Sequence, residues 1–127
     1  MDLLLDTHVV LWWNEGSLRL GDAARDQIGD PGNRVYVSAA TPWEIAIKAR
    51  KGKLAFRGPL DRLIEDNGFV SLSIDPKHGI LAGALDWNHP DPFDRVLVAQ
   101  ALTENLVLVH ADRTIRGYDG VGQLWAG

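Results

Sequence analysis

Apolar residues along the chain fall into short runs that have the length and composition of buried β-strands. The run at 105–109 is apolar almost throughout, as expected for a strand that is covered on both faces of a parallel sheet. Polar and apolar positions alternate at 69–74, which indicates a strand with one exposed face. The predicted strands, the last of them weaker than the others, are 2–6, 34–38, 69–74, 105–109 and 122–125.

Segments of helical length lie between these runs, bounded by residues that start or stop helices. Asp91 and Pro92 precede the longest segment and predict an N-cap and a first helical position. Thr41, Pro42 and Glu44 have the spacing of a capping box, which predicts that another helix opens at Thr41. The predicted helices are 22–28, the segment that opens at Thr41, 59–67, 76–85 and 92–104. Strands that alternate with helices indicate an α/β fold with a mainly parallel sheet and helices on both of its faces.

Length and composition limit the size of the fold and exclude several kinds of site. The chain has 127 residues, 46% hydrophobic and 24% charged, which predicts one ordered domain over residues 1–127. The absence of cysteine excludes disulfides, thiolate zinc sites and cysteine nucleophiles, and it is compatible with a reducing compartment. No apolar run reaches the roughly 18 residues that span a bilayer, and no basic segment precedes an apolar one near the N-terminus. We therefore expect a cytoplasmic protein with no membrane association.

The charge balance is mildly acidic, with a net charge of −4 and a pI of about 5.4. This balance argues against a protein that holds nucleic acid by its total charge. Basic residues are nevertheless concentrated in one stretch, which contains Lys48, Arg50, Lys51, Lys53 and Arg57. The stretch is either the solvated end of a helix or a local contact for phosphate groups.

Acidic residues follow two of the predicted strands and begin two of the predicted helices. Asp6 comes directly after the first strand, and Asp112 follows the fourth by three residues. Asp94 and Glu44 lie in the first turns of their helices. Because ligands of open parallel sheets bind beyond the carboxyl ends of the strands, neighbouring first and fourth strands would bring these acids to one edge. We therefore take Asp6, Glu44, Asp94 and Asp112 as candidate catalytic residues.

Clustered carboxylates raise one another's pKa unless a cation neutralises them. Mg²⁺ and Mn²⁺ prefer carboxylate and water oxygens, and such an ion can activate water for phosphodiester hydrolysis. Each acid alone also has a structural interpretation: Asp6 and Asp112 as caps of short helices, and Asp94 as a complement to a helix dipole. Glu44 can complete the capping box or pair with Lys48 four residues later. The functional hypothesis therefore depends on the four acids together.

Four segments, in the order in which they occur, resemble the PIN-domain ribonucleases, and most closely the VapC-type toxins of bacterial toxin–antitoxin pairs. They are 3–8 (LLLDTH), 38–45 (SAATPWEI), 91–95 (DPFDR) and 108–112 (LVHAD). The resemblance extends from Asp2 to about Trp125, and the DPFDR segment followed by an apolar helix is its most specific part. It implies a three-layer α/β/α sandwich around the parallel sheet.

The resemblance also implies an activity and a division of roles among the acids. PIN-domain toxins cleave single-stranded or looped RNA with metal-activated water, so we expect a Mg²⁺-dependent endoribonuclease, with Mn²⁺ as an alternative ion. Asp6 and Asp94 are the expected direct metal ligands, whereas Glu44 and Asp112 are expected to act through water or to orient the nucleophile. The expected partners are the RNA substrate, a cognate antitoxin that occupies an apolar groove beside the acids, and a second copy in a homodimer.

One position departs from the usual pattern of the family. Two residues before the last acid, family members often carry Thr or Ser, whose hydroxyl group helps to order water, and here the residue is His110. The histidine can replace that hydrogen bond, bind Mn²⁺ or point away, and the sequence leaves these alternatives open. The departure supports a second hypothesis, a catalytically weak PIN-like module that binds RNA or a protein partner.

The sequence also suggests places for several large side chains. Trp12, Trp13 and Trp43 are core candidates, but adjacent tryptophans on a helix lie about 100° apart, so one of the first two is expected to line a groove. Arg95 is expected to steady a carboxylate, to contact a phosphate or to form a structural ion pair. No pattern indicates a partner for His89.

Overall fold

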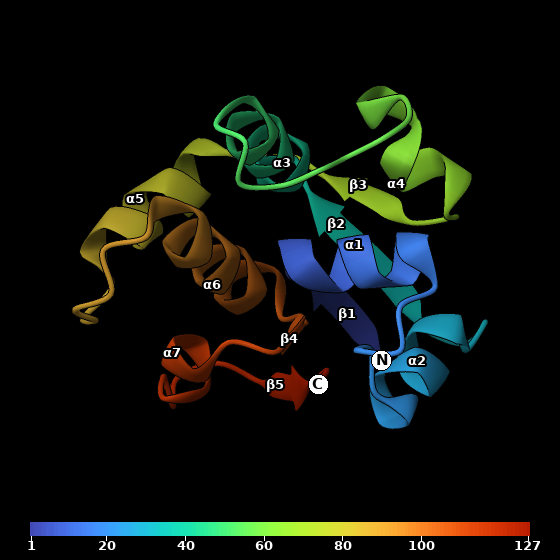
Figure 1. Cartoon of the computed structure of the whole chain (residues 1–127). Coiled ribbons are helices and arrows are strands. Elements are labelled where there is room, and N and C mark those ends of the chain that lie inside the picture. Colours follow the sequence, from blue (N-terminus) through green and yellow to red (C-terminus); the bar gives the residue numbers. More distant parts are fainter.

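The computed structural model describes all 127 residues and is built around one five-stranded sheet (Figure 1). Every pair of neighbouring strands runs parallel, in the order β3–β2–β1–β4–β5. The strands are β1 (Asp2–Leu5), β2 (Arg34–Ser38), β3 (Val70–Leu72), β4 (Val107–His110) and β5 (Gln123–Trp125). The α/β class and the five predicted strands are confirmed, and β1 lies beside β4, as the hypothesis for the acids requires.

Seven α-helices connect the strands, and every predicted helical segment contains at least one of them. They are α1 (Thr7–Glu15), α2 (Asp22–Gly29), α3 (Ala40–Arg50), α4 (Leu63–Asp66), α5 (Pro76–Ala84), α6 (Pro92–Glu104) and α7 (Arg113–Arg116). A 3₁₀ turn at Leu60–Arg62 precedes α4, so the helix predicted over 59–67 is divided into two shorter pieces. None of the helices combines the length and the apolar character required to cross a membrane.

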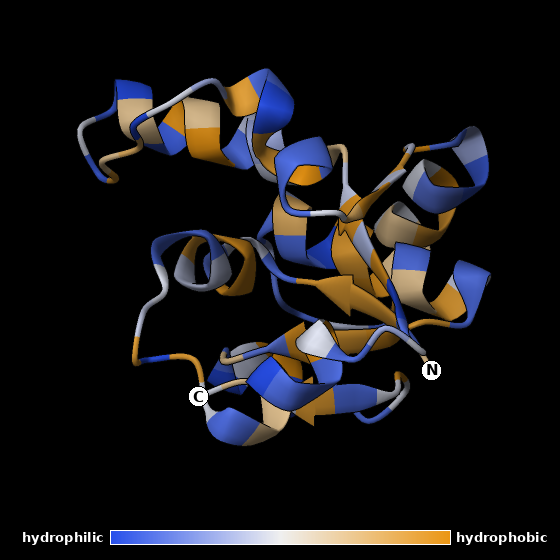
Figure 2. Ribbon diagram, turned by 90° about the vertical axis from the view of Figure 1, so that its right-hand side faces the viewer, coloured by the Kyte–Doolittle hydropathy of each residue, from blue (hydrophilic) through white to orange (hydrophobic).

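Successive residues of the central strand β1 face two separate apolar layers, which produces the α/β/α arrangement. Leu3 and Leu5 pack with residues of α1, α2, α3 and α4. Leu4 packs on the opposite face with residues of α6 and α7. Figure 2 shows apolar residues along the central strands and alternating polar and apolar residues along the helices around them. Burial on both faces explains why β1 and β4 appear in the sequence as continuous apolar runs.

Helix α3 begins two residues earlier than the predicted start, which has Thr41 as N-cap and Pro42 as the first helical residue, and the expected capping box is absent. Ala39 occupies the N-cap position and has no side chain that could cap the helix, while the Ser38 hydroxyl accepts the N–H of Ala40. Thr41 lies within the first turn, is fully buried, and contacts the hydroxyl group of Thr7 on α1. Glu44 accepts a hydrogen bond from Thr7 of α1 with one carboxylate oxygen and pairs with Lys48 of its own helix through the other. The capping prediction is wrong because contacts between α1 and α3 engage the side chains that would cap an isolated helix.

Candidate active site

The carboxyl ends of β1 and β4 bring Asp6 and Asp112 to the same edge of the sheet. The strands pair directly, and the backbone N–H of Asp6 donates to the carbonyl of Val109 over 2.9 Å. Asp6 occupies the N-cap position of α1, but its side chain makes no capping hydrogen bond and Asp6 is 6% exposed. The Asp112 Oδ1 accepts the N–H groups of Thr114 and Ile115 over 2.7 and 3.1 Å. The capping interpretation is therefore confirmed for the side chain of Asp112 and is wrong for that of Asp6.

Glu44 reaches the same region from α3 and is held by two side chains. Its Oε1 accepts a hydrogen bond from the Thr7 hydroxyl over 2.6 Å, and its Oε2 is paired with Lys48. Because the single hydroxyl proton of Thr7 is donated to Glu44, the Thr41 hydroxyl donates to Thr7 across their 3.2 Å contact. Glu44 is buried, and both of its carboxylate oxygens already have donors. The ion pair suggested by the spacing of Glu44 and Lys48 is therefore present.

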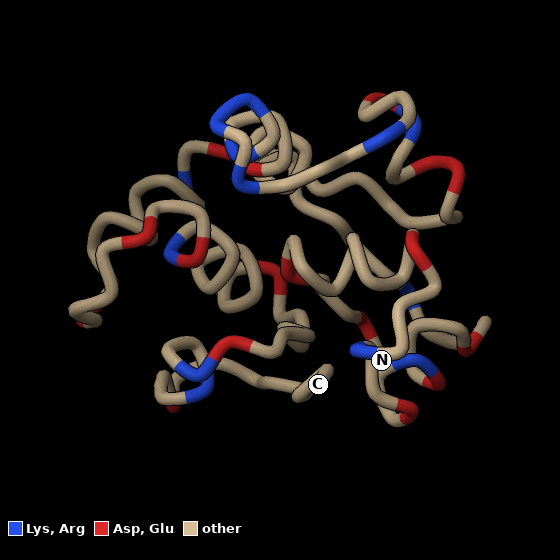
Figure 3. Tube along the Cα trace, in the orientation of Figure 1, with Lys and Arg blue, Asp and Glu red and all other residues tan.

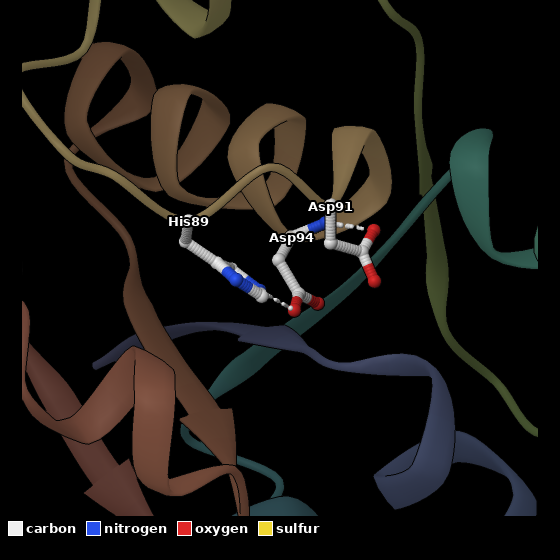
Figure 4. Close-up of side chains that lie close together, drawn as sticks. All are labelled: His89, Asp91 and Asp94. Atoms are coloured by element: carbon white, nitrogen blue, oxygen red, sulfur yellow. Dashed lines mark hydrogen bonds and ion pairs between the residues drawn. The ribbon is translucent and has the colours of Figure 1, made fainter.

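Asp94 lies in the first turn of α6, between two side chains that define its surroundings (Figure 4). The Oδ1 of Asp91 accepts the backbone N–H groups of Phe93 and Asp94 over 2.9 and 3.3 Å, which confirms the predicted N-cap. The Nε2 atom of His89 lies 2.6 Å from Oδ2 of Asp94. One ligand atom from each of His89, Asp91 and Asp94 can be chosen so that all three lie within 4.8 Å of one another. Asp94 thus has one oxygen engaged by His89 and one without a hydrogen bond from the protein.

Burial and mutual repulsion raise the pKa of two of the acids, Asp6 and Asp94. The pKa of Asp6 is raised from 3.8 to about 8, chiefly by burial and then by the charges of Asp94, Glu44 and, more weakly, Asp112. The pKa of Asp94 is raised to about 6, again chiefly by burial, although the hydrogen bond with His89 lowers it. The structure therefore brings the four predicted acids into one electrostatically coupled group.

The chemistry of this group fits a hard divalent cation. Lys48 is the only lysine or arginine that forms an ion pair with any of the four acids, and its partner is Glu44. Asp6 is consequently a buried acid without a positive partner, a state that costs free energy unless the group binds a proton or a cation. Carboxylate oxygens are the ligands that Mg²⁺ and Mn²⁺ prefer, and oxygens without protein donors remain on Asp94 and Asp112 as well.

A hollow of about 190 Å³ opens beside the acids. Asp6 and Asp112 line it together with His8, Trp12 and Ala111. A volume of this size holds several water molecules, so water and small ions can reach the carboxylates. Trp12 is the member of the adjacent tryptophan pair that borders this hollow, as expected for one of the two residues, while Trp13 is half-buried and packs beside Phe69 at the edge of the core.

A larger hollow of about 330 Å³ adjoins the N-terminal end of α6 and is rich in lysine. We call it the basic groove, and its lining residues are Ile47, Lys48, Lys51, Lys53, Pro90, Asp91, Pro92 and Phe93. Figure 3 shows basic residues gathered around the end of α3 and the loop that follows it. Lys51 and Lys53 have no acidic partner in the protein, so their charges are available to an anionic ligand.

His110 points away from the acids, which selects one of the three alternatives for this residue. Its Nδ1 accepts the backbone N–H of Asp112 over 3.1 Å, and its Nε2 lies 2.7 Å from Oε1 of Gln123. Because Nδ1 is an acceptor, the ring proton is assigned to Nε2 and is donated to Gln123. The ring packs edge-on against Trp125, and burial lowers the pKa of His110. Both ring nitrogens are occupied, so His110 has no free nitrogen for a metal ion.

Three side chains differ from their sequence-based interpretations. Trp43, expected in the core, is 60% exposed and contacts Phe93 edge-on at a centroid distance of 5.0 Å. Arg95 forms no ion pair and donates instead to backbone carbonyls at the end of α5 and in the α5–α6 connection. His89 contacts Asp94, five residues later, across the start of a helix. Neither helical nor strand periodicity brings residues at that separation together, so no pattern in the sequence could reveal the pair.

The chain is similar to known proteins over nearly its full length. Residues 3–121 match the PIN domain family. Ribonuclease VapC22 of Mycobacterium tuberculosis is 31% identical over 121 residues, which cover 91% of this chain and 91% of that protein.

Two solved structures share the fold at lower sequence identity. One is VapBC2 from Rickettsia felis, bound to a DNA fragment from its promoter. The alignment covers 100% of both chains, with a TM-score of 0.67 and 12% identity. A toxin–antitoxin complex from Klebsiella pneumoniae covers 96% of this chain and 95% of its own, with a TM-score of 0.67 and 16% identity. With its parallel sheet, its grouped acids and its 31% identity to a VapC ribonuclease, the chain belongs to the PIN-domain family, in the VapC-type ribonuclease branch.

Proposed function

We propose that the protein is the toxin of a toxin–antitoxin pair, acting in the cytoplasm as a Mg²⁺-dependent endoribonuclease that hydrolyses RNA phosphodiester bonds, with Mn²⁺ able to replace Mg²⁺. The observation that carries this proposal is the buried carboxylate of Asp6, which has no positive partner and lies in a group with Glu44, Asp94 and Asp112. Strongly perturbed acids of this kind cluster at functional sites. Membership of the VapC-type branch supports RNA as the substrate.

The hydrogen bonds of the four acids suggest different roles. Asp6 and Asp94 are the proposed ligands, because burial raises the pKa of both carboxyl groups and each keeps an oxygen without a hydrogen bond from another side chain. These two carboxylates would hold a Mg²⁺ ion, which would supply the activation of water and the stabilisation of charge on the phosphoryl oxygens. Glu44 has donors on both oxygens, and these contacts would hold its carboxylate in place to orient the attacking water. Asp112 caps α7 through Oδ1 and keeps Oδ2 to accept a hydrogen bond from that water.

The basic groove supplies the proposed contact with the RNA backbone. Lys48 belongs both to the groove and to the ion pair with Glu44, so the groove leads to the acids. The unpaired charges of Lys51 and Lys53 would hold phosphates on one side of the scissile bond. Contacts of this kind position a strand without reading its sequence, and they weaken as salt increases. The local charge thus offsets the net charge of −4, which would otherwise repel RNA.

An apolar hollow on the same Pro90–Phe93 segment is the proposed surface for protein partners. It has a volume of about 330 Å³, and its lining residues are Trp43, Ile74, Ala82, Gly83, Pro90, Pro92, Phe93, Arg95 and Val96. Trp43 and Ile74 are exposed, and large exposed apolar groups often mark interaction surfaces. We assign this surface to the cognate antitoxin, and we also expect the toxin to form a homodimer. The similarity to the toxin–antitoxin complex from Klebsiella pneumoniae supports an antitoxin partner.

Cleavage of small structured RNAs by the purified chain tests the proposed activity. We expect cleavage with Mg²⁺ or Mn²⁺, none in EDTA, and a loss of at least about 100-fold in Asp6→Asn and Asp94→Asn. Asp26→Asn is the matched control, because Asp26 is an exposed acid on α2 with no hydrogen bond or ion pair, and this variant should retain full activity.

Cleavage that persists in EDTA or in the two site variants would contradict the metal mechanism. Tight RNA binding without cleavage under any divalent cation would instead favour the second hypothesis, a PIN-like module that only binds RNA or a protein partner.

A further inference from the structure

We propose that His89 is a positioning residue for Asp94 and that Arg95 holds the loop that presents His89. The proposal rests on the proposed function, because it assigns to these residues a role in preparing the metal site. It adds two residues of the α5–α6 connection and the start of α6 to a site otherwise made of carboxylates.

The contact between His89 and Asp94 is short and shielded from water. Nε2 of His89 lies 2.6 Å from Oδ2 of Asp94, and the two side chains are 18% and 11% exposed. An ionised carboxylate only accepts hydrogen bonds, so the imidazole must carry a proton on Nε2. The hydrogen bond fixes the rotation of the carboxylate and engages Oδ2, which leaves Oδ1 for a cation. Figure 4 shows the ring directed at this oxygen.

Trp87 limits the movement of the His89 ring. The two ring centroids are 4.8 Å apart and the rings are tilted by 55°. Trp87 itself packs beside Tyr118, at a centroid distance of 5.1 Å. The imidazole is therefore supported on one side by an aromatic ring that is anchored elsewhere in the protein.

Arg95 fixes the backbone that carries His89. Its guanidinium donates to the carbonyls of Ala82, Leu85, Trp87 and His89 over 2.9, 2.9, 2.6 and 3.1 Å. No carboxylate competes for the guanidinium, and the connection it binds has no regular secondary structure after α5. The rigid fork of arginine can satisfy several carbonyls at once, which a lysine cannot do in the same geometry. The hydrogen bonds from Arg95 thus engage backbone carbonyls of the loop that have no partners from a helix or strand.

A role for His89 as a direct ligand is less consistent with the contacts. Its Nε2 is already bonded to Asp94, and the Oδ1 of Asp91, the third member of this close group, caps α6. Groups that orient metal ligands through hydrogen bonds typically change metal affinity by about 10–100-fold when they are removed. We therefore expect His89 to act on affinity through Asp94.

Titration of Mn²⁺ into the full-length protein by calorimetry tests the proposal without any RNA. We expect His89→Ala to weaken Mn²⁺ binding by about 10–100-fold, and His89→Gln, which keeps an N–H donor, to restore most of the affinity. Arg95→Lys should weaken binding in the wild-type background but change it by less than about twofold when combined with His89→Ala, because it acts through His89. Arg19→Lys, an exposed arginine without an ion pair, should leave binding unchanged.

Magnetic resonance supplies readouts that do not depend on how well the variants fold. The ¹⁵N spectrum of the wild-type imidazole should show a protonated Nε2, and an unprotonated Nε2 would overturn the proposal. Pulsed electron paramagnetic resonance of bound Mn²⁺ should lack the strong nitrogen coupling of a directly bound imidazole, and its presence would also overturn the positioning role.

The outcomes separate this inference from the proposed function. If the wild type binds Mn²⁺ and Asp94→Asn abolishes binding, but folded His89→Ala binds as tightly as the wild type, only the role of His89 is wrong. If the wild type binds no Mn²⁺ at all, the metal site fails and the positioning role fails with it.

Discussion

Asp6 is nearly buried at the end of β1, in a position where a carboxylate is unfavourable for folding. The Asp6 side chain makes no capping hydrogen bond, so helix α1 does not require an aspartate at its N-cap position. Burial and the negative charges of Asp94, Glu44 and Asp112 raise the pKa of Asp6, and a backbone hydrogen bond from Thr7 opposes them only in part. A protein that keeps an acid in such a place loses stability when the site is empty, and a cation reverses that loss by binding the folded state.

Asp6→Asn should therefore stabilise the metal-free protein in a pH-dependent way. The pKa of Asp6 rises from an ordinary value of 3.8 to about 8 in the folded chain. Between about pH 4 and pH 8 the folded state therefore holds a proton that the unfolded state has released. The contribution of Asp6 is most favourable below pH 4 and is lost as the pH rises towards 8. In EDTA, urea unfolding should show equal stability of variant and wild type near pH 4 and an advantage of at least about 1 kcal/mol for Asp6→Asn at pH 8.

The matched variant Asp26→Asn, at an exposed position on α2, should follow the pH dependence of the wild type. Equal pH dependence in Asp6→Asn and the wild type would mean that the Asp6 carboxylate is not held in the unfavourable state described above.

At the scale of elements, the connection from β4 to α7 places Asp112 through backbone contacts. His110 ends β4 and accepts the N–H of Asp112, while Asp112 caps α7 with its side chain. Gln123 on β5 holds the other ring nitrogen of His110. The edge of the sheet that carries the acids is thus fixed by a buried polar network, and His110 has a structural role in it.

His110→Ala should cost about 2–4 kcal/mol of unfolding free energy, because it leaves partly buried partners unsatisfied and opens a cavity beside Trp125. Urea unfolding measures this change. His8→Ala is the control, since His8 is exposed and forms no hydrogen bond in the protein, and it should change stability by less than about 0.5 kcal/mol. A similar small effect of His110→Ala would show that the network does not stabilise this edge.

The elements that the sequence could predict are those whose signal is local. The apolar run at 105–109 and the Asp91–Pro92 start of α6 are sufficient by themselves to indicate a strand and a helix. The start of α3 could not be predicted in the same way, because Thr41 is engaged by Thr7, 34 positions away in sequence. The acids could be assigned to one edge because parallel strands end together, whereas their hydrogen bonds to His89, Thr7 and backbone groups depend on tertiary structure.

At the scale of the whole molecule, charge is separated into an acidic site and an adjoining basic groove. The net charge of −4 conceals this arrangement, since the lysines at the end of α3 are concentrated next to Pro90–Phe93. The net charge therefore does not predict which ligands the protein binds, because the position of each charge decides which ligands it attracts.

Lys51→Gln should weaken RNA binding and reduce its salt dependence. Each phosphate contact that is lost lowers the slope of log affinity against log salt by about 0.7 for a single strand. The measurement is fluorescence anisotropy of a labelled RNA with Asp6→Asn protein, which prevents cleavage, at several salt concentrations. Arg19→Gln removes a positive charge from the α1–α2 connection and should leave the slope unchanged. Equal slopes for both variants would show that the basic groove does not contact RNA.

The most direct test of the central claim is the anomalous scattering of crystals grown with Mn²⁺. We expect an anomalous peak bonded to carboxylate oxygens of Asp6 and Asp94, with Glu44 and Asp112 nearby, and no such peak in crystals of Asp6→Asn. A peak elsewhere on the protein, or none at a saturating concentration of Mn²⁺, would contradict the claim that these acids form a divalent-cation site.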